Sequence, residues 1–220
     1  MNKQIRELVA EFLGTFTLVF IGMGSVIVAS TAEFNANVIV PALGHGLILV
    51  GLIYAFGHIS GAHFNPAVTV ALLVGRKINL QKAVLYIVTQ FVAGIVAAFL
   101  MAAIIPGLLV YGETVGALTD EYVWNAALME VVLTFFLASA VFQAAVYNKA
   151  GNLAGVAIGF TLAASILAGG PFTGASLNPA RTLGPALAAG HLDYVIPYLV
   201  GIFGGGALAG VVHGWLLTES

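Results

Sequence analysis

The chain has 220 residues, of which 60% are hydrophobic and only 7% are charged. Soluble domains carry about a quarter charged residues, so this composition excludes an ordinary water-soluble globule and indicates a protein whose solvent is lipid. The net charge of −2 gives no reason to expect a nucleic-acid partner, and the absence of cysteine excludes disulfides and thiolate metal sites. We therefore expect the lipid bilayer as a partner, and neither a metal nor a cofactor.

Six stretches are long and apolar enough to cross a membrane, which takes about 20 mostly apolar residues in a helix. They lie at about 5–29, 39–57, 82–105, 122–147, 153–170 and 194–217. The first stretch follows a basic start but lacks a small-residue cleavage site, so we interpret it as a span and not as a removed signal. Two further apolar stretches, at about 65–75 and 178–188, are too short to cross.

The orientation follows from the basic residues. Six spans leave both termini on one side of the membrane, and that side carries Lys3, Arg6, Arg76, Lys77, Lys82 and Lys149. The positive-inside rule makes it the cytoplasm. We predict a multi-pass integral membrane protein with both termini cytoplasmic. Its short termini and the lack of an organelle signal favour a prokaryotic plasma membrane.

One motif occurs twice, as "SGAHFNPAVTV" at 60–70 and as "TGASLNPARTL" at 173–183, with the two asparagines 113 residues apart (178 − 65). Glu11 in "AEFLGTF" likewise aligns with Glu130 in "MEVVLTF". Three spans in each half, about 1–110 and 120–220, force the second half to insert upside down. We predict an all-α membrane protein, a single transmembrane domain over 1–220, with six transmembrane helices and two re-entrant half-helices in an inverted repeat.

The repeated triplet has a specific chemistry. Asparagine is a favoured helix cap and proline is favoured at the first helical position, so each triplet predicts a helix start. Two half-helices whose N-termini meet at the midplane create a positive centre that repels cations. The asparagine amides are donors that orient a passing water and interrupt proton transfer. The triplets are Asn65, Pro66 and Ala67, and Asn178, Pro179 and Ala180.

The residues before each asparagine are predicted to be extended backbone whose carbonyls form a row of acceptors. They are Gly61, Ala62, His63 and Phe64, and Gly174, Ala175, Ser176 and Leu177. Glu11 and Glu130 are acids within spans, and we expect each to accept hydrogen bonds from buried N–H groups of a re-entrant loop in a structural role. Arg181 directly follows the second triplet, and an arginine at membrane depth indicates function.

The stretches "HISGAHFNPAVTV" and "GASLNPARTLGPA" resemble the two signature loops of the major intrinsic protein family, the aquaporins and aquaglyceroporins. The resemblance covers essentially the whole chain. It implies passive conduction rather than enzymatic activity, and a homotetramer of four independent pores. It also implies a narrow filter near the outer mouth, at four positions. Carried over by spacing from the asparagines, these are His45, Ile166, Ala175 and Arg181.

This filter, with "ILAGGPFTGASLNPAR", resembles the plant tonoplast intrinsic proteins. That likeness implies a water channel that excludes protons and ions, with ammonia, hydrogen peroxide and urea as further candidate solutes, and it keeps a location other than the plasma membrane open. Strong ammonia conductors of that group have a histidine in the third loop. The loop here, "PGLLVYGETVGALTDEY", has none.

Two alternatives stay open. A glycerol facilitator of the same fold is the first, because Pro197 and Tyr198 resemble the glycerol branch, although Thr182 directly after the arginine favours water. An ion-coupled secondary transporter is the second, since inverted repeats with broken helices serve such proteins too. It would need midplane acids or an ion site, and the acids within spans already have a structural explanation.

Overall fold

The computed structural model describes residues 2–31 and 37–218. Six helices are long and apolar enough to span a membrane. They are α1 (Lys3–Ser30), α2 (Ile39–Ser60), α4 (Leu80–Ile104), α5 (Val123–Ala140), α6 (Ala154–Thr173) and α8 (Val195–Val211). The π-helical segments η2 (Val141–Val146) and η4 (Val212–Leu216) continue α5 and α8, and the 3₁₀ turn η3 (Gly151–Leu153) precedes α6. Each predicted span is therefore confirmed as a long apolar helix.

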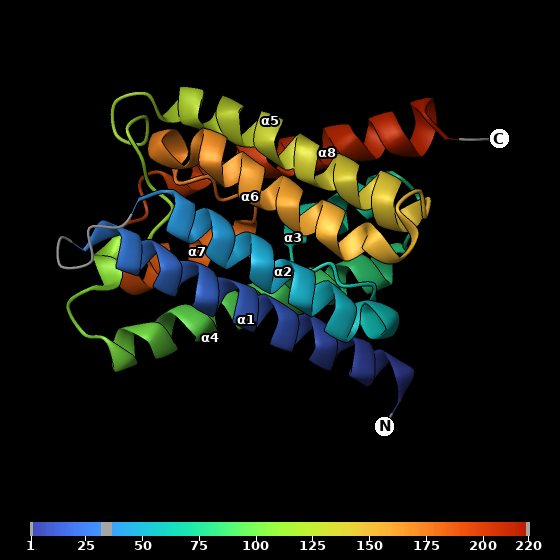
Figure 1. The fold of residues 1–220 in the computed structure, drawn as a ribbon, viewed down its shortest axis with the longest axis horizontal. Coiled ribbons are helices and arrows are strands. Elements are labelled where there is room, and N and C mark those ends of the chain that lie inside the picture. The colour runs from blue at the N-terminus through green and yellow to red at the C-terminus, as the bar shows by residue number, and fades with distance from the viewer. Residues whose placement is uncertain (1, 32–36, 219–220) are drawn as a thin grey trace.

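Two shorter helices, α3 (Pro66–Val74) and α7 (Pro179–Ala189), correspond to the stretches predicted to be too short to cross. They point toward each other from opposite ends of the bundle and touch where they begin. The start of α1 and the end of η4 lie at the same end of the bundle (Figure 1). A further 3₁₀ turn, η1 (Leu109–Gly112), lies in the connection between the two halves of the chain. The predicted all-α fold with two half-helices is confirmed.

Equivalent helices of the two halves make equivalent contacts. Helix α1 packs on α2 and α4, and α5 packs on α6 and α8. Each half also holds the half-helix of the other, because α8 packs on α3 and α4 packs on α7. The halves are interlocked in this way, so neither short helix is exposed to lipid along its whole length.

Glycines let helices of the two halves approach closely. A Cβ on Gly206 of α8 would lie 2.5 Å from the carbonyl oxygen of Ala67, and one on Gly94 of α4 would lie 2.7 Å from the carbonyl oxygen of Ala180. No side chain fits at either position without moving backbone. Small residues at such interfaces are what lets transmembrane helices pack on one another.

We predict that Gly206→Ala destabilises the protein, because the new methyl group collides with the first turn of α3. Overpacking of this kind costs about 1–3 kcal/mol. Thermal unfolding in detergent, followed by circular dichroism, measures the change. Gly204→Ala on the same helix is the matched control, since its Cβ meets nothing closer than Val131 at 3.8 Å. Equal melting temperatures for the two variants would contradict this account of the packing.

Candidate functional site

Each half-helix begins directly after an asparagine that caps it. Asn65 Oδ1 accepts from the N–H groups of Ala67 at 2.8 Å and Val68 at 3.4 Å. Asn178 Oδ1 accepts from those of Ala180 at 3.0 Å and Arg181 at 3.4 Å. Proline follows at the first helical position in both copies, where no N–H is needed. The helix starts predicted from the two triplets are thus in place.

The same asparagines also bind each other's loops. Asn65 Nδ2 donates to the carbonyl of Leu177 at 2.7 Å, and Asn178 Nδ2 donates to the carbonyl of Phe64 at 3.0 Å. This reciprocal brace was not predicted, since we placed both amide groups in the lumen. A carboxamide has two N–H donors. The brace takes one from each asparagine, and the second stays available to the cavity that both residues line.

The backbone before each asparagine is not extended throughout, so that prediction is wrong. Ala62 and Phe64 have φ of 53° and 49°, and Ala175 and Leu177 have φ of 44° and 53°. Non-glycine residues in this left-handed region are strained, and such strain is found mainly where the surroundings enforce it for function. The glycine of each motif is also left-handed, with φ of 94° at Gly61 and 77° at Gly174.

Glu11 supplies the groups that hold the first loop in this conformation. Its carboxylate is completely buried. It accepts from the N–H groups of His63 at 3.0 Å and Phe64 at 2.8 Å. It also accepts from Ser60 Oγ at 2.6 Å and Gln90 Nε2 at 2.8 Å. Consecutive N–H groups of an extended strand point to opposite sides, so the left-handed residues are what turn both toward one carboxylate.

Glu130 repeats this arrangement in the second loop. It is also completely buried, and it accepts from the N–H groups of Ser176 at 2.9 Å and Leu177 at 2.8 Å. Thr173 Oγ1 donates to it at 2.7 Å. A buried carboxylate is costly unless it is fully hydrogen-bonded, and these three donors meet that requirement.

The glutamates determine where the loop carbonyls point. In a trans peptide the C=O of one residue is opposed to the N–H of the next. The N–H groups turned toward Glu11 therefore direct the carbonyls of Ala62 and His63 away from it, and both residues line the cavity. Of the eight carbonyls predicted as pore acceptors, those of Phe64 and Leu177 instead accept from the asparagines.

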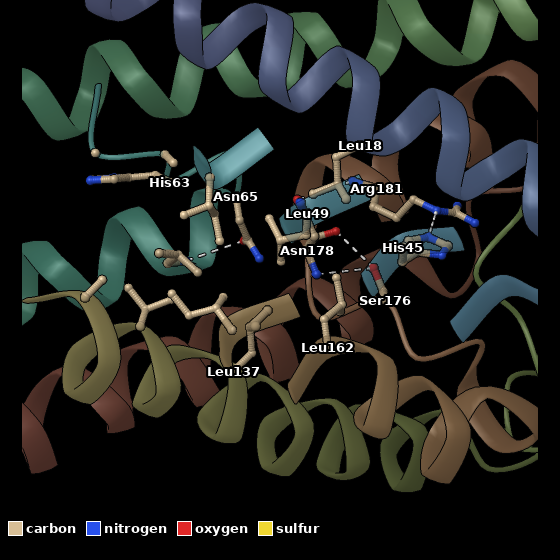
Figure 2. A pocket seen from close by; sticks show the side chains of 17 residues that line it. Leu18, His45, Leu49, His63, Asn65, Leu137, Leu162, Ser176, Asn178 and Arg181 are labelled. Atoms are coloured by element: carbon tan, nitrogen blue, oxygen red, sulfur yellow. Dashed lines mark hydrogen bonds between the residues drawn. The ribbon is translucent and has the colours of Figure 1, made fainter. Parts of the chain in front are cut away.

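A cavity runs past the meeting point of the two half-helices. His63 lies toward one end, His45 and Arg181 lie together at the other, and the two asparagines lie between (Figure 2). Its other polar lining residue is Ser176. The remaining lining residues are small or aliphatic: Leu18, Leu49, Ile53, Gly61, Ala62, Val68, Leu137, Val141, Ala145, Ile158 and Leu162. One wall is thus apolar and the other offers hydrogen bonds.

Arg181 and His45 form a hydrogen-bonded pair at one end of the cavity. Arg181 Nε donates to His45 Nε2 at 3.2 Å, and His45 Nδ1 lies 2.8 Å from the carbonyl of Pro41. The carbonyl requires a donor and the arginine requires an acceptor, so these partners specify a neutral imidazole with its proton on Nδ1. Arg181 Nη1 is buried without a hydrogen-bond partner among the described residues.

The other two predicted filter residues lie behind the cavity surface. Ile166 and Ala175 are 2% and 3% exposed and pack in one apolar cluster with Leu162 and Leu177. Neither belongs to the described residues that line the cavity. The structure therefore brings His45 and Arg181 to the lining and sets Ile166 and Ala175 just behind it.

Several lining residues were missed from the sequence. Ser176 was considered only for its carbonyl, yet its hydroxyl binds Thr182 Oγ1 at 2.6 Å and faces the cavity. The equivalent position of the first motif is His63, whose Nδ1 lies 3.0 Å from Thr69 Oγ1. The spacing of 113 residues was a signal for this pair. The aliphatic lining residues had none, because nothing marks one leucine of a span as facing a cavity.

A second polar cluster, without an assigned role from the sequence, follows η1. The Glu113 carboxylate is almost completely buried, accepts from Tyr194 OH at 3.3 Å and lies 3.2 Å from His191 Nδ1. Burial raises the pKa of the Glu113 carboxyl, while His191 opposes the shift. This cluster ties the connection between the halves to the segment that joins α7 and α8.

The family model described as Major intrinsic protein matches residues 1–213, which is nearly the whole chain. The chain belongs to the major intrinsic protein family. Its relatives include a probable aquaporin TIP3-2 from Arabidopsis thaliana, 38% identical over 98% of this chain and 85% of the relative. A probable aquaporin TIP1-1 from Oryza sativa subsp. japonica is 40% identical over 95% of this chain and 86% of the relative.

A solved member of the family has the same fold. The X-ray structure of the aquaglyceroporin from Plasmodium falciparum matches with a TM-score of 0.81 over 97% of both chains, at 24% identity. Major intrinsic proteins of the aquaporin type are channels and not enzymes, and this chain is a multi-pass integral membrane protein of that kind. The relatives are from plants and give the predicted prokaryotic plasma membrane no support.

We predict that Asn178→Asp raises cation or proton flux at least tenfold. Aspartate keeps the cap of α7, but it loses the donor to Phe64 and places a negative charge at the positive centre. A pH-sensitive dye inside proteoliposomes under a potassium diffusion potential measures the flux. Asn178→Ala, which removes cap and brace without adding charge, is the comparison. A leak of equal size in both variants would show that disordered packing, and not charge, opens the path.

Proposed function

We propose that this protein is a passive water channel that excludes protons and ions. The observation that carries the proposal is the reciprocal pair of asparagine donors, each capping a half-helix at the midpoint of a narrow cavity. Similarity to aquaporins over nearly the whole chain supports it. Ammonia, hydrogen peroxide and urea are the further neutral solutes that we propose to test.

The cavity wall explains how water would pass while protons do not. The carbonyls of the first loop accept hydrogen bonds along one side, and the aliphatic wall opposite offers none, so waters align in single file. At the asparagines a water accepts hydrogen bonds through its oxygen and cannot also accept a proton from its neighbour. The two helix N-termini add positive potential at this point and repel cations.

Arg181 and His45 form the proposed filter. Arg181 contributes a fixed charge and an unused buried N–H group, and the neutral His45 fixes the guanidinium through Nε. Ile166 and Ala175 act from behind, where their size limits how far the wall retreats. The filter then discriminates by charge and width together.

The coarser features of the assembly are proposals as well. We propose one transmembrane domain with halves of about 1–110 and 120–220, assembled as a homotetramer. The start of α1 and the end of η4 share the end of the bundle where Arg76 lies over the Trp215 ring and Lys82 pairs with Glu7. The positive-inside rule makes this end cytoplasmic.

A glycerol facilitator is the competing function, but its sequence signal lies outside the cavity. Tyr198 is completely buried, and its hydroxyl contacts Thr119 Oγ1 at 2.8 Å and donates to the carbonyl of Thr173 at 3.0 Å. These contacts give it a packing role near the second loop. Likeness in fold to an aquaglyceroporin does not separate the two functions, since the fold is common to both.

Stopped-flow light scattering on proteoliposomes separates them directly. We expect rapid shrinkage in an impermeant osmolyte, with a low activation energy, and no faster re-swelling in glycerol than in protein-free vesicles. Fast glycerol entry would replace the water channel by the glycerol facilitator. Shrinkage no faster than in protein-free vesicles would overturn both.

We predict that Arg181→Val keeps water permeability within about twofold and raises proton leak at least tenfold, because the fixed charge of the filter is lost. The dye assay and the shrinkage assay measure the two fluxes on the same vesicles. Arg76→Val is the matched control, the same substitution at an exposed arginine outside the cavity. Unchanged proton exclusion in Arg181→Val would remove Arg181 from the filter.

A further inference from the structure

The inverted repeat gives every filter position an equivalent in the inner half of the cavity. We call the four proposed filter residues the outer ring: His45, Ile166, Ala175 and Arg181. The spacing between the two asparagines, 113 residues, relates them to the inner ring: Ile158, Ile53, Ala62 and Val68, in that order. All four residues of the inner ring line the cavity.

The spacing holds in three dimensions on the two long helices. A Cβ on Gly46 of α2 would lie 2.7 Å from the carbonyl oxygen of Gly159 of α6, and one on Gly159 would lie 2.5 Å from that of Gly46 (159 − 46 = 113). Gly46 also meets Ala163 at 2.7 Å, and Gly159 meets Val50 at 2.4 Å. These reciprocal contacts place the crossing of α2 and α6 midway between residues 46 and 50, and likewise between 159 and 163.

The rings lie on opposite sides of this crossing. His45 precedes its centre by three residues on α2, and Ile158 precedes it by three residues on the antiparallel α6. At a rise of 1.5 Å per residue, each is about 5 Å from the crossing, in opposite directions. Ile53 and Ile166 follow the centre by five residues, which corresponds to about 8 Å.

The loop members of the two rings are equally well matched. Ala62 and Ala175 share the left-handed conformation, and the N–H of each binds the hydroxyl of the residue two before it, Ser60 or Thr173, at 3.0 Å. Val68 and Arg181 occupy the same position of α3 and α7, where the N–H of each lies 3.4 Å from the capping asparagine.

The rings share one backbone frame but differ in chemistry. Two positions keep their residue type, isoleucine and alanine. The other two replace the hydrogen-bonded pair of His45 and Arg181 by Ile158 and Val68. The outer ring therefore carries a charge and polar groups, whereas the side chains of the inner ring are all aliphatic.

We propose that the inner ring is a second, apolar constriction that determines solute specificity in series with the outer ring. The proposal rests on the channel function above. A hydrophobic constriction acts by dewetting. A solute such as urea loses hydrogen bonds there that the aliphatic side chains do not replace, while water keeps its neighbours in the file. A solute must therefore pass a charged ring and an apolar ring, and opening one leaves the other limiting.

Urea permeability of paired variants tests the series arrangement. His45→Ala opens the outer ring, and His45→Ala with Ile158→Ala opens both. We expect urea uptake by the double variant, measured by light scattering in proteoliposomes, to exceed that of His45→Ala at least fivefold. The matched control is His45→Ala with Leu162→Ala, an equal truncation one turn along α6 that lies outside both rings, and it should stay within twofold of His45→Ala.

Val68→Thr in the His45→Ala background is the second test, because it keeps the side-chain shape and adds a hydroxyl to the inner ring. It should also raise urea uptake above His45→Ala. Equal uptake by His45→Ala and by both inner-ring doubles overturns the proposal, as does an equal increase with Leu162→Ala. Water permeability of the wild-type protein is read separately, so failure of the channel function is distinguished from failure of the inner ring.

Discussion

The rest of the structure depends on one constraint: backbone polar groups at the centre of a bilayer must be hydrogen-bonded within the protein. Two loops end at this depth, and each exposes N–H groups that lipid cannot satisfy. Glu11 and Glu130 accept from these groups, and Asn65 and Asn178 cap the half-helices and bind the opposite loop. All four residues are polar groups that would be costly alone. Together they satisfy one another, which is why they recur as matched pairs.

Satisfying this constraint also creates the chemistry of the cavity. The glutamates draw the loop N–H groups to one side, so the carbonyls of Ala62 and His63 turn to the other. The left-handed residues needed for this geometry cost about 1–3 kcal/mol each. The buried network over-determines the loops and maintains that strain. The hydrogen-bonding wall of the cavity is therefore a consequence of how the loops are anchored.

The two halves provide a symmetric frame, and function follows from where they differ. Thr69 and Thr182 bind side chains at equivalent positions, yet those side chains are His63 in one loop and Ser176 in the other. The same divergence separates the charged pair at one end of the cavity from the aliphatic residues at the other. A symmetric frame with unequal side chains gives a pathway whose two ends discriminate differently.

The sequence by itself determined the spans, the half-helices and their caps, because hydropathy and the pair Asn-Pro act over a few residues. It also indicated Glu11, Glu130, His45 and Arg181 as polar groups that need partners in an apolar setting. Only the tertiary structure decided which partners they have, since the brace joins residues 112 and 114 positions apart. It also decided that Ile166 packs behind the cavity while Ile53 lines it. Two isoleucines at equivalent positions look the same in sequence, and only packing against neighbouring helices determines which one faces the cavity.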